Sequence, residues 1–197
     1  RRALYVAMLL HDIAKGRGGN HSVLGAEVAL VICPRLGLSN EETETVSWLI
    51  LHHLLMSKIA FRYDLNDPQT IEDFASIVQS PERLKLLLVL TVADIRAVGP
   101  DIWNGWKAAL MRDLYCSCDA VLRGADPAVI AFGNAEEARQ EAAAKLTDWD
   151  AARFASHAVN MPLTYWTGFE CGSQVRHARL CDQFANQDAL LLIDFKP

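Results

Sequence analysis

The sequence lacks the features of a nucleic-acid-binding protein and of a membrane protein. It has 24 acidic and 19 basic residues, a net charge of −5, whereas a nucleic-acid groove needs a basic face. Its longest apolar runs, such as residues 84–93, are too short to cross a bilayer. No internal repeat and no low-complexity segment is present. We therefore expect a globular protein with no nucleic-acid partner and no membrane contact.

Cysteine is scarce and follows no pattern of a zinc site or of disulfides. The five Cys are odd in number and scattered, and Cys116-Ser-Cys118 is not a zinc-binding spacing. We interpret them as buried thiols in a reducing compartment, which predicts a cytoplasmic location.

Neither end of the sequence has the form of a natural terminus. Position 1 is not Met, and Arg1-Arg2 enters a helical pattern already in progress. Residues 189–195 are typical of a strand that ends before it can pair. We therefore expect a piece of a longer protein.

The apolar residues, 51% of the chain, follow a helical period through most of its length. Capping residues and Pro, Gly or Asn punctuation place the helix boundaries. Helices are predicted over residues 1–15, 21–36, 39–59, 67–78, 81–98, 101–122, 135–146 and 174–184, with further helix starts at Asp126-Pro127 and Asn134 and a connector at 162–168. The expected fold is all-α: a helical bundle over residues 1–124, followed by a helical extension and linker over 125–197.

The most informative stretch is His11-Asp12, which follows the apolar run of residues 3–10. A buried, unpaired carboxylate at the end of an apolar helix is costly, so Asp12 needs a cation or a donor. Imidazole and carboxylate are ordinary ligands of divalent metals. The plainer alternative is a helix end at which Asp12 pairs with Lys15, an arrangement common on helix surfaces.

Three further positions bear the same residue types. His21 follows a glycine-rich turn, His52-His53 lies within a predicted helix, and Asp94 interrupts the apolar run of another. Each has a plain explanation: His21 as a helix start, and a helical His as a satisfied core or surface group. Adjacent helical residues point about 100° apart, so His52 and His53 need not both face one site. Asp94 could instead pair with an arginine.

Together these residues favour a metal-dependent hydrolase of a phosphoester or phosphoanhydride. Two divalent ions held by imidazoles and a shared carboxylate can clamp a phosphate and activate a water. Lys15 could neutralise charge on a phosphate oxygen, and Arg17 or Arg96 could do so with two hydrogen bonds.

His-Asp followed later by a helical Asp resembles the signature of the HD phosphohydrolase superfamily. The closer resemblance is to the HD domains of the bifunctional PII uridylyltransferase/uridylyl-removing enzymes of bacterial nitrogen control. The motifs that resemble them are His11-Asp-Ile-Ala-Lys-Gly-Arg-Gly-Gly-Asn-His-Ser22, His52-His-Leu-Leu-Met-Ser57, Leu90-Thr-Val-Ala-Asp-Ile-Arg-Ala97 and Trp103-Asn-Gly-Trp-Lys107. This resemblance covers residues 1–124 well, and Arg176-His-Ala-Arg-Leu180 resembles the segment that leads to the family's regulatory ACT domains.

The resemblance implies metal-dependent removal of UMP from uridylylated PII, with glutamine sensed elsewhere in the full-length protein. It implies that His11, Asp12 and Asp94 bind a metal, and that His21 with one or both of His52 and His53 serves a second ion. Mn²⁺ or Mg²⁺ is the expected metal, with Fe or Zn as alternatives. The superfamily's first metal-binding His lies upstream of the HD pair, and no His precedes His11 here. The ligand set is therefore expected to lack one imidazole.

Two other functions use the same residues. An HD nucleotidase or cyclic-nucleotide phosphodiesterase would act on free nucleotides through the same metal ligands. A non-catalytic module would dock PII with a vestigial metal site.

Overall fold

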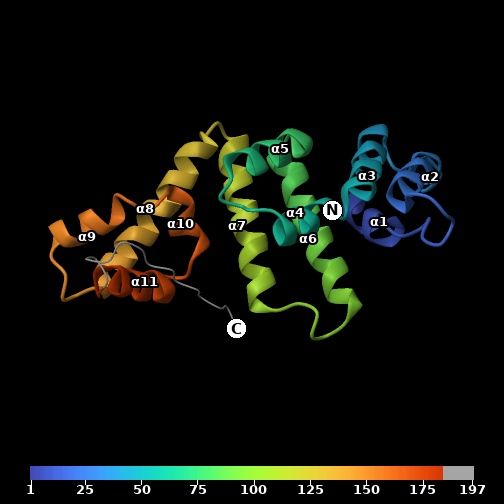
Figure 1. Cartoon of the computed structure of the whole chain (residues 1–197). Coiled ribbons are helices and arrows are strands. Elements are labelled where there is room, and N and C mark those ends of the chain that lie inside the picture. Colours follow the sequence, from blue (N-terminus) through green and yellow to red (C-terminus); the bar gives the residue numbers. More distant parts are fainter. Residues whose placement is uncertain (184–197) are drawn as a thin grey trace. The chain divides into compact units, whose positions relative to one another are not determined.

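The structure is a computed structural model, and it describes residues 1–183. All regular secondary structure in this range is helical (Figure 1), which confirms the all-α prediction. The helices are α1 (Arg2–Leu10), α2 (His21–Arg35), α3 (Asn40–His52), α4 (Leu55–Arg62), α5 (Pro68–Val78), α6 (Pro81–Val98), α7 (Gly105–Leu122), α8 (Pro127–Lys145), α9 (Ala151–Ala158), α10 (Leu163–Gly168) and α11 (Cys171–Gln183). The strand predicted at 189–195 lies outside the described residues.

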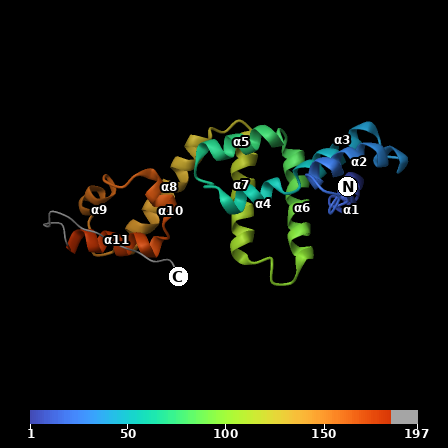
Figure 2. The ribbon, with the colours of Figure 1, turned by 45° about the vertical axis from the view of Figure 1, so that its right-hand side comes forward.

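The chain forms two compact units, residues 1–127 and 128–197. In the first unit α1 and α2 pack against α3, and α6 and α7 lie side by side in both views (Figures 1 and 2). One apolar core joins these helices, with Leu49, Phe74, Leu87 and Leu114 among its fully buried members. Burial of such side chains stabilises the unit by roughly 1.5–3 kcal/mol each.

The second unit contains α9, α10, α11 and nearly all of α8, around a smaller core of Ala135, Ala142, Ala158 and Trp166. Within residues 1–183 no helix has the length and apolarity needed to traverse a bilayer.

Local capping chemistry sets most helix starts, as predicted. Ser39 forms a capping box with Glu42 at the start of α3. Asp67 and Ser80 cap α5 and α6, each followed by a proline at the first helical position. These bonds satisfy amide groups that have no partner inside the helix. Asp101 does not open α7, because Asn104 provides the cap and the helix begins at Gly105.

Two predicted helices end earlier than expected, and both ends involve an imidazole. The first stops at Leu10 instead of Lys15, and the third stops at His52 instead of continuing to residue 59. At these breaks His11 Nδ1 lies 2.8 Å from the Met8 carbonyl oxygen and His53 Nδ1 lies 2.7 Å from that of Ile50. In a continuing helix each carbonyl would accept from the amide four residues later. The imidazole takes that place, and the helix ends.

The connector predicted at residues 162–168 is wrong, because Leu163–Gly168 forms the short helix α10. Its Trp166 is buried in the core of the second unit, and this tertiary packing provides the stabilisation that the local pattern does not indicate. Helix α8 begins at Pro127, as the predicted start at Asp126-Pro127 indicates, and it continues through the second predicted start at Asn134 to Lys145.

Candidate metal centre

The site begins in the turn that follows α1. His11 directs its Nε2 atom toward two carboxylates, 3.8 Å from Asp12 Oδ2 and 3.3 Å from Asp94 Oδ1. Asp94 lies in α6, more than 80 residues further along the chain. The packing of α1 against α6 therefore joins two predicted site residues that are distant in sequence.

His21 enters the site as the first residue of α2. Gly16, Gly18 and Gly19 precede it with φ values of +83°, +79° and +76°, a backbone region that glycine adopts without strain. The side chain of Asn20 accepts a 3.0 Å hydrogen bond from the amide of Ser22, which caps the helix. His21 Nε2 then lies 3.5 Å from Asp12 Oδ1.

His53 is the most deeply buried member of the cluster. Its side chain is only 1% exposed, and its Nε2 atom lies 3.9 Å from Asp12 Oδ1. Its ring centroid is 5.3 Å from those of both His11 and His21. One ligand atom from each of Asp12, His21 and His53 falls within 4.8 Å of the others, a spacing that could hold a metal ion.

The structure brings His53, and not His52, to this cluster. The His52 ring lies against Trp48, with centroids 4.9 Å apart. Burial and the nearby Arg83 charge lower the pKa of His52. His52 therefore packs on Trp48 of its own helix, and the Arg83 guanidinium of α6 lies 5.0 Å from the centre of the Trp48 ring. Among the described residues, the group of possible metal ligands includes His53 and not His52.

Asp12 and Lys15 form the ion pair that the plainer interpretation predicted, with Nζ 2.7 Å from Oδ2. Partial burial works to raise the pKa of Asp12, but the hydrogen bond and charge of Lys15, with electrostatic contributions from His11 and His53, outweigh it, so the pKa lies below its usual value. Asp12 therefore presents an ionised carboxylate to the three imidazoles. Arg17 and Arg96 are exposed, and within residues 1–183 no ion pair joins either to the cluster.

Comparison with known proteins places the cluster within one protein family. The family model described as "HD domain" matches residues 1–97. Residues 1–97 are an HD domain. This stretch includes the complete His and Asp cluster from His11 to Asp94, and HD domains belong to a superfamily of metal-dependent hydrolases.

The chain is also similar over most of its length to three curated bacterial proteins, each named bifunctional uridylyltransferase/uridylyl-removing enzyme. It is 58% identical over 182 residues to the protein of Azospirillum brasilense and 53% identical over 184 residues to that of Gluconobacter oxydans, covering 91% of this chain and 19% of the relative in both cases. With the protein of Rhodospirillum rubrum it is 50% identical over 198 residues, covering 100% of this chain and 21% of the relative. The chain thus spans about a fifth of the length of these relatives. No solved structure matches it.

The donor atoms of the HD domain fit a divalent metal. A carbonyl oxygen only accepts hydrogen bonds, so the contacts to Met8 and Ile50 require that His11 and His53 have their proton on Nδ1. Both Nε2 atoms then present a free lone pair to the Asp12 side of the site, as metal ligation needs. Burial also lowers the pKa of His53, which keeps that imidazole neutral and able to bind a cation.

Gly25 is a contributor that the sequence patterns did not identify. A Cβ atom built on this α2 residue would lie 2.9 Å from Ile50 Cγ2 and 3.7 Å from the carbonyl oxygen of His11. The missing side chain therefore lets α2 approach both α3 and the turn that holds Asp12. A glycine inside a helical pattern was the available signal, since it is costly unless close packing requires it.

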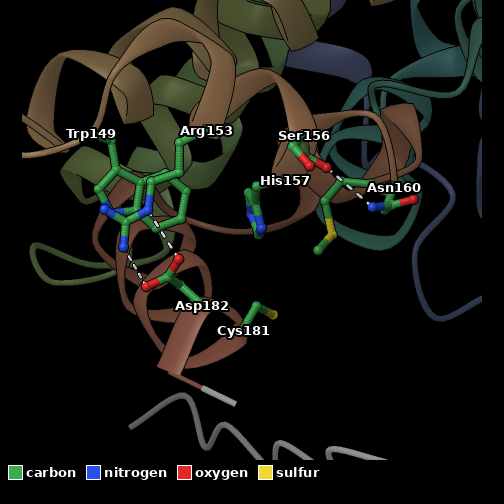
Figure 3. A pocket seen from close by; sticks show the side chains of 8 residues that line it. Trp149, Arg153, Ser156, His157, Asn160, Cys181 and Asp182 are labelled. Carbon is green, nitrogen blue, oxygen red and sulfur yellow. Dashed lines mark hydrogen bonds and ion pairs between the residues drawn. The ribbon is translucent and has the colours of Figure 1, made fainter. Parts of the chain in front are cut away.

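A cavity of about 450 Å³ lies elsewhere, in the second unit. Figure 3 shows it between α9 and α11, where Arg153 forms an ion pair with Asp182 beside Trp149, and His157 lies along its wall. It includes no predicted site residue.

Proposed function

We propose that residues 1–124 form a metal-dependent phosphodiester hydrolase that removes UMP from uridylylated PII. The observation that supports this most directly is the convergence of Asp12, His21 and His53, with ligand atoms within 4.8 Å of one another and His11 and Asp94 alongside. Neutral imidazoles and carboxylates are the ligands of metals that activate water.

The proposed metal is Mn²⁺ or Mg²⁺, with Fe and Zn as alternatives. His11, Asp12, His21, His53 and Asp94 would hold it. When bound, a divalent ion supplies a water of lowered pKa as nucleophile and neutralises charge on the phosphate.

The other proposed roles belong to cationic side chains around the cluster. Lys15 holds its ammonium beside Asp12 and would meet the negative charge of the phosphate. Arg17 and Arg96 are exposed on the adjacent loop and helix, where each could reach a substrate oxygen after a side-chain rotation. Asp94, with Oδ1 3.3 Å from His11 Nε2, would bind the metal beside that imidazole and would be a catalytic residue together with Asp12 and Lys15.

The substrate is inferred from the relatives. Their name, uridylyltransferase/uridylyl-removing enzyme, describes removal of a uridylyl group. The similarity to the protein of Rhodospirillum rubrum covers this whole chain, including the HD cluster. We propose the same cytoplasmic reaction here, with uridylylated PII as partner and glutamine sensed in a part of the protein beyond this chain.

The test is release of UMP from uridylylated PII by this chain with added Mn²⁺. Wild type should release UMP, and Asp94→Ala should release none. If Asp94→Ala is as fast as wild type, the assigned site is wrong. Prompt hydrolysis of free nucleotides, with none of uridylylated PII, would identify a nucleotidase instead. Binding of PII without any hydrolysis would identify a docking module.

A further inference from the structure

A groove begins one residue after the site histidine His53 and follows the outer face of α4. Its volume is about 330 Å³. The residues that line it recur at helical spacing: Leu54, Ser57, Lys58, Phe61 and Arg62. Since α4 rises about 1.5 Å per residue, the groove leads away from the HD cluster for about 12 Å.

The charges in the groove are all positive. Lys58 and Arg62 are four residues apart on one helix face, where like charges repel. No ion pair or hydrogen bond to either side chain is present within residues 1–183. Arg62 lies in the last turn of α4 and is favourable to the helix dipole, but Lys58 is a full turn earlier. The repulsion is therefore uncompensated in a chain whose net charge is −5.

The far end of the groove is aromatic and has a third cation. Phe61 stacks on Trp106 of α7, with centroids 6.0 Å apart and planes at 24°. Lys107 Nζ lies 5.8 Å from the centre of the Phe61 ring. The Trp106 side chain is 61% exposed, an unusual exposure for the largest apolar residue. Exposed aromatics and arginine, here Trp106 and Arg62, are enriched on surfaces that bind another protein.

We propose that this groove docks the protein that carries the scissile phosphodiester, and that an acidic segment of that protein fills it. This inference rests on the proposed function, which requires a protein substrate at the HD cluster. Carboxylates of the segment would pair with Lys58 and Arg62 and relieve their repulsion. An extended segment of three or four residues, at about 3.3 Å each, matches the length of the groove.

The test uses the double charge reversal Lys58→Glu/Arg62→Glu in this chain. Both side chains are exposed, so the variant should fold, which circular dichroism would check. The matched control is Lys85→Glu/Arg112→Glu, two exposed cations outside the groove with the same change in net charge. We would measure binding of uridylylated PII by calorimetry at two salt concentrations. We would also measure KM and kcat for UMP release, and the hydrolysis of bis(p-nitrophenyl) phosphate with Mn²⁺.

The groove variant should bind uridylylated PII at least about tenfold more weakly and lose most of the salt dependence. The small phosphodiester, which needs no docking, should be hydrolysed at the wild-type rate, and the control should match wild type throughout. Unchanged KM and binding in the groove variant would overturn docking while UMP release by wild type upheld the proposed function. Charge-dependent binding of uridylylated PII without UMP release would uphold docking in the groove and overturn the proposed function. A change of oligomeric state in the groove variant, with unchanged binding, would make the groove a contact between copies and overturn the proposal.

Discussion

Replacing Gly25 by Ala sets two opposing effects against each other. In an open helix this change stabilises by about 0.5–1 kcal/mol, because glycine loses more backbone entropy on folding. Here the new Cβ would meet Ile50 Cγ2 at 2.9 Å, closer than real Cβ contacts. Ile50 is fully buried, and a β-branched residue in a helix has essentially one χ1 rotamer, so this methyl group cannot swing away.

The clash should outweigh the gain in helix propensity. Overpacking of a core costs about 1–3 kcal/mol, so Gly25→Ala should lower the free energy of unfolding by roughly 1–2 kcal/mol. It should also weaken Mn²⁺ binding, because α2 holds His21 and would be displaced from the turn of Asp12. Urea unfolding and metal titration would measure the two effects.

Three further variants test this expected loss of stability. Gly105→Ala, where a Cβ atom meets nothing within 4 Å, should be neutral or slightly stabilising. In the Gly25→Ala background, Ile50→Val keeps Cγ2 and should give no relief. Ile50→Ala removes Cγ2. Alone it should lower the free energy of unfolding by about 2–5 kcal/mol, and this loss should be markedly smaller in the Gly25→Ala background. Gly25→Ala at or above wild-type stability would refute the close approach of α2 to α3.

The remaining predictions concern the cluster itself. Excess Mn²⁺ or Mg²⁺ should raise the melting temperature of wild type, about 2.7 kcal/mol of added stability at 100 times Kd, and Asp12→Ala should abolish the rise in a thermal-shift assay. His53→Gln should abolish it as well while His52→Gln keeps it; the opposite result would make His52 the ligand. Without metal, stability should fall as the pH drops below about 6.5, because burial lowers the pKa of His53 in the folded chain and the unfolded chain takes up the proton first. Urea midpoints at pH 7.5 and 5.5 should show this loss, smaller in His53→Gln; an unchanged loss would remove His53 as its source.

The sequence predicted those parts of the fold that depend on local chemistry. Capping residues such as Ser39 and Ser80 act on amides two or three positions away, so their helix starts could be read from the pattern. The helix ends at Leu10 and His52 could not be predicted in this way, because each helix ends where an imidazole donates a hydrogen bond to a main-chain carbonyl. The short helix α10 could not either, because burial of Trp166 against distant residues stabilises it.

The sequence also named the residues that meet at the HD cluster, because carboxylates and imidazoles stood inside apolar runs. It could not choose between His52 and His53, since adjacent residues face different sides and only the packing of α3 decides which side is inward. The distribution of ligands over one or two metal ions stays a prediction. The role of Gly25 depends on a distance between helices that no local pattern contains.

The hydrogen bonds from His11 and His53 to main-chain carbonyls have a consequence for how this site tolerates mutation. In many metal sites a second side chain orients the ligand, and its replacement typically costs 10–100-fold in metal affinity. Here the orienting groups are the carbonyls of Met8 and Ile50, which remain whatever amino acid occupies those positions. For His11 and His53, a mutational scan should find loss of metal affinity at the ligands themselves and at the helix contacts that position them. It should find no further side chain whose only role is to orient these two imidazoles. A change of side chain at position 8 would therefore cost core packing, to which Met8 contributes, without altering which nitrogen of His11 faces the metal site.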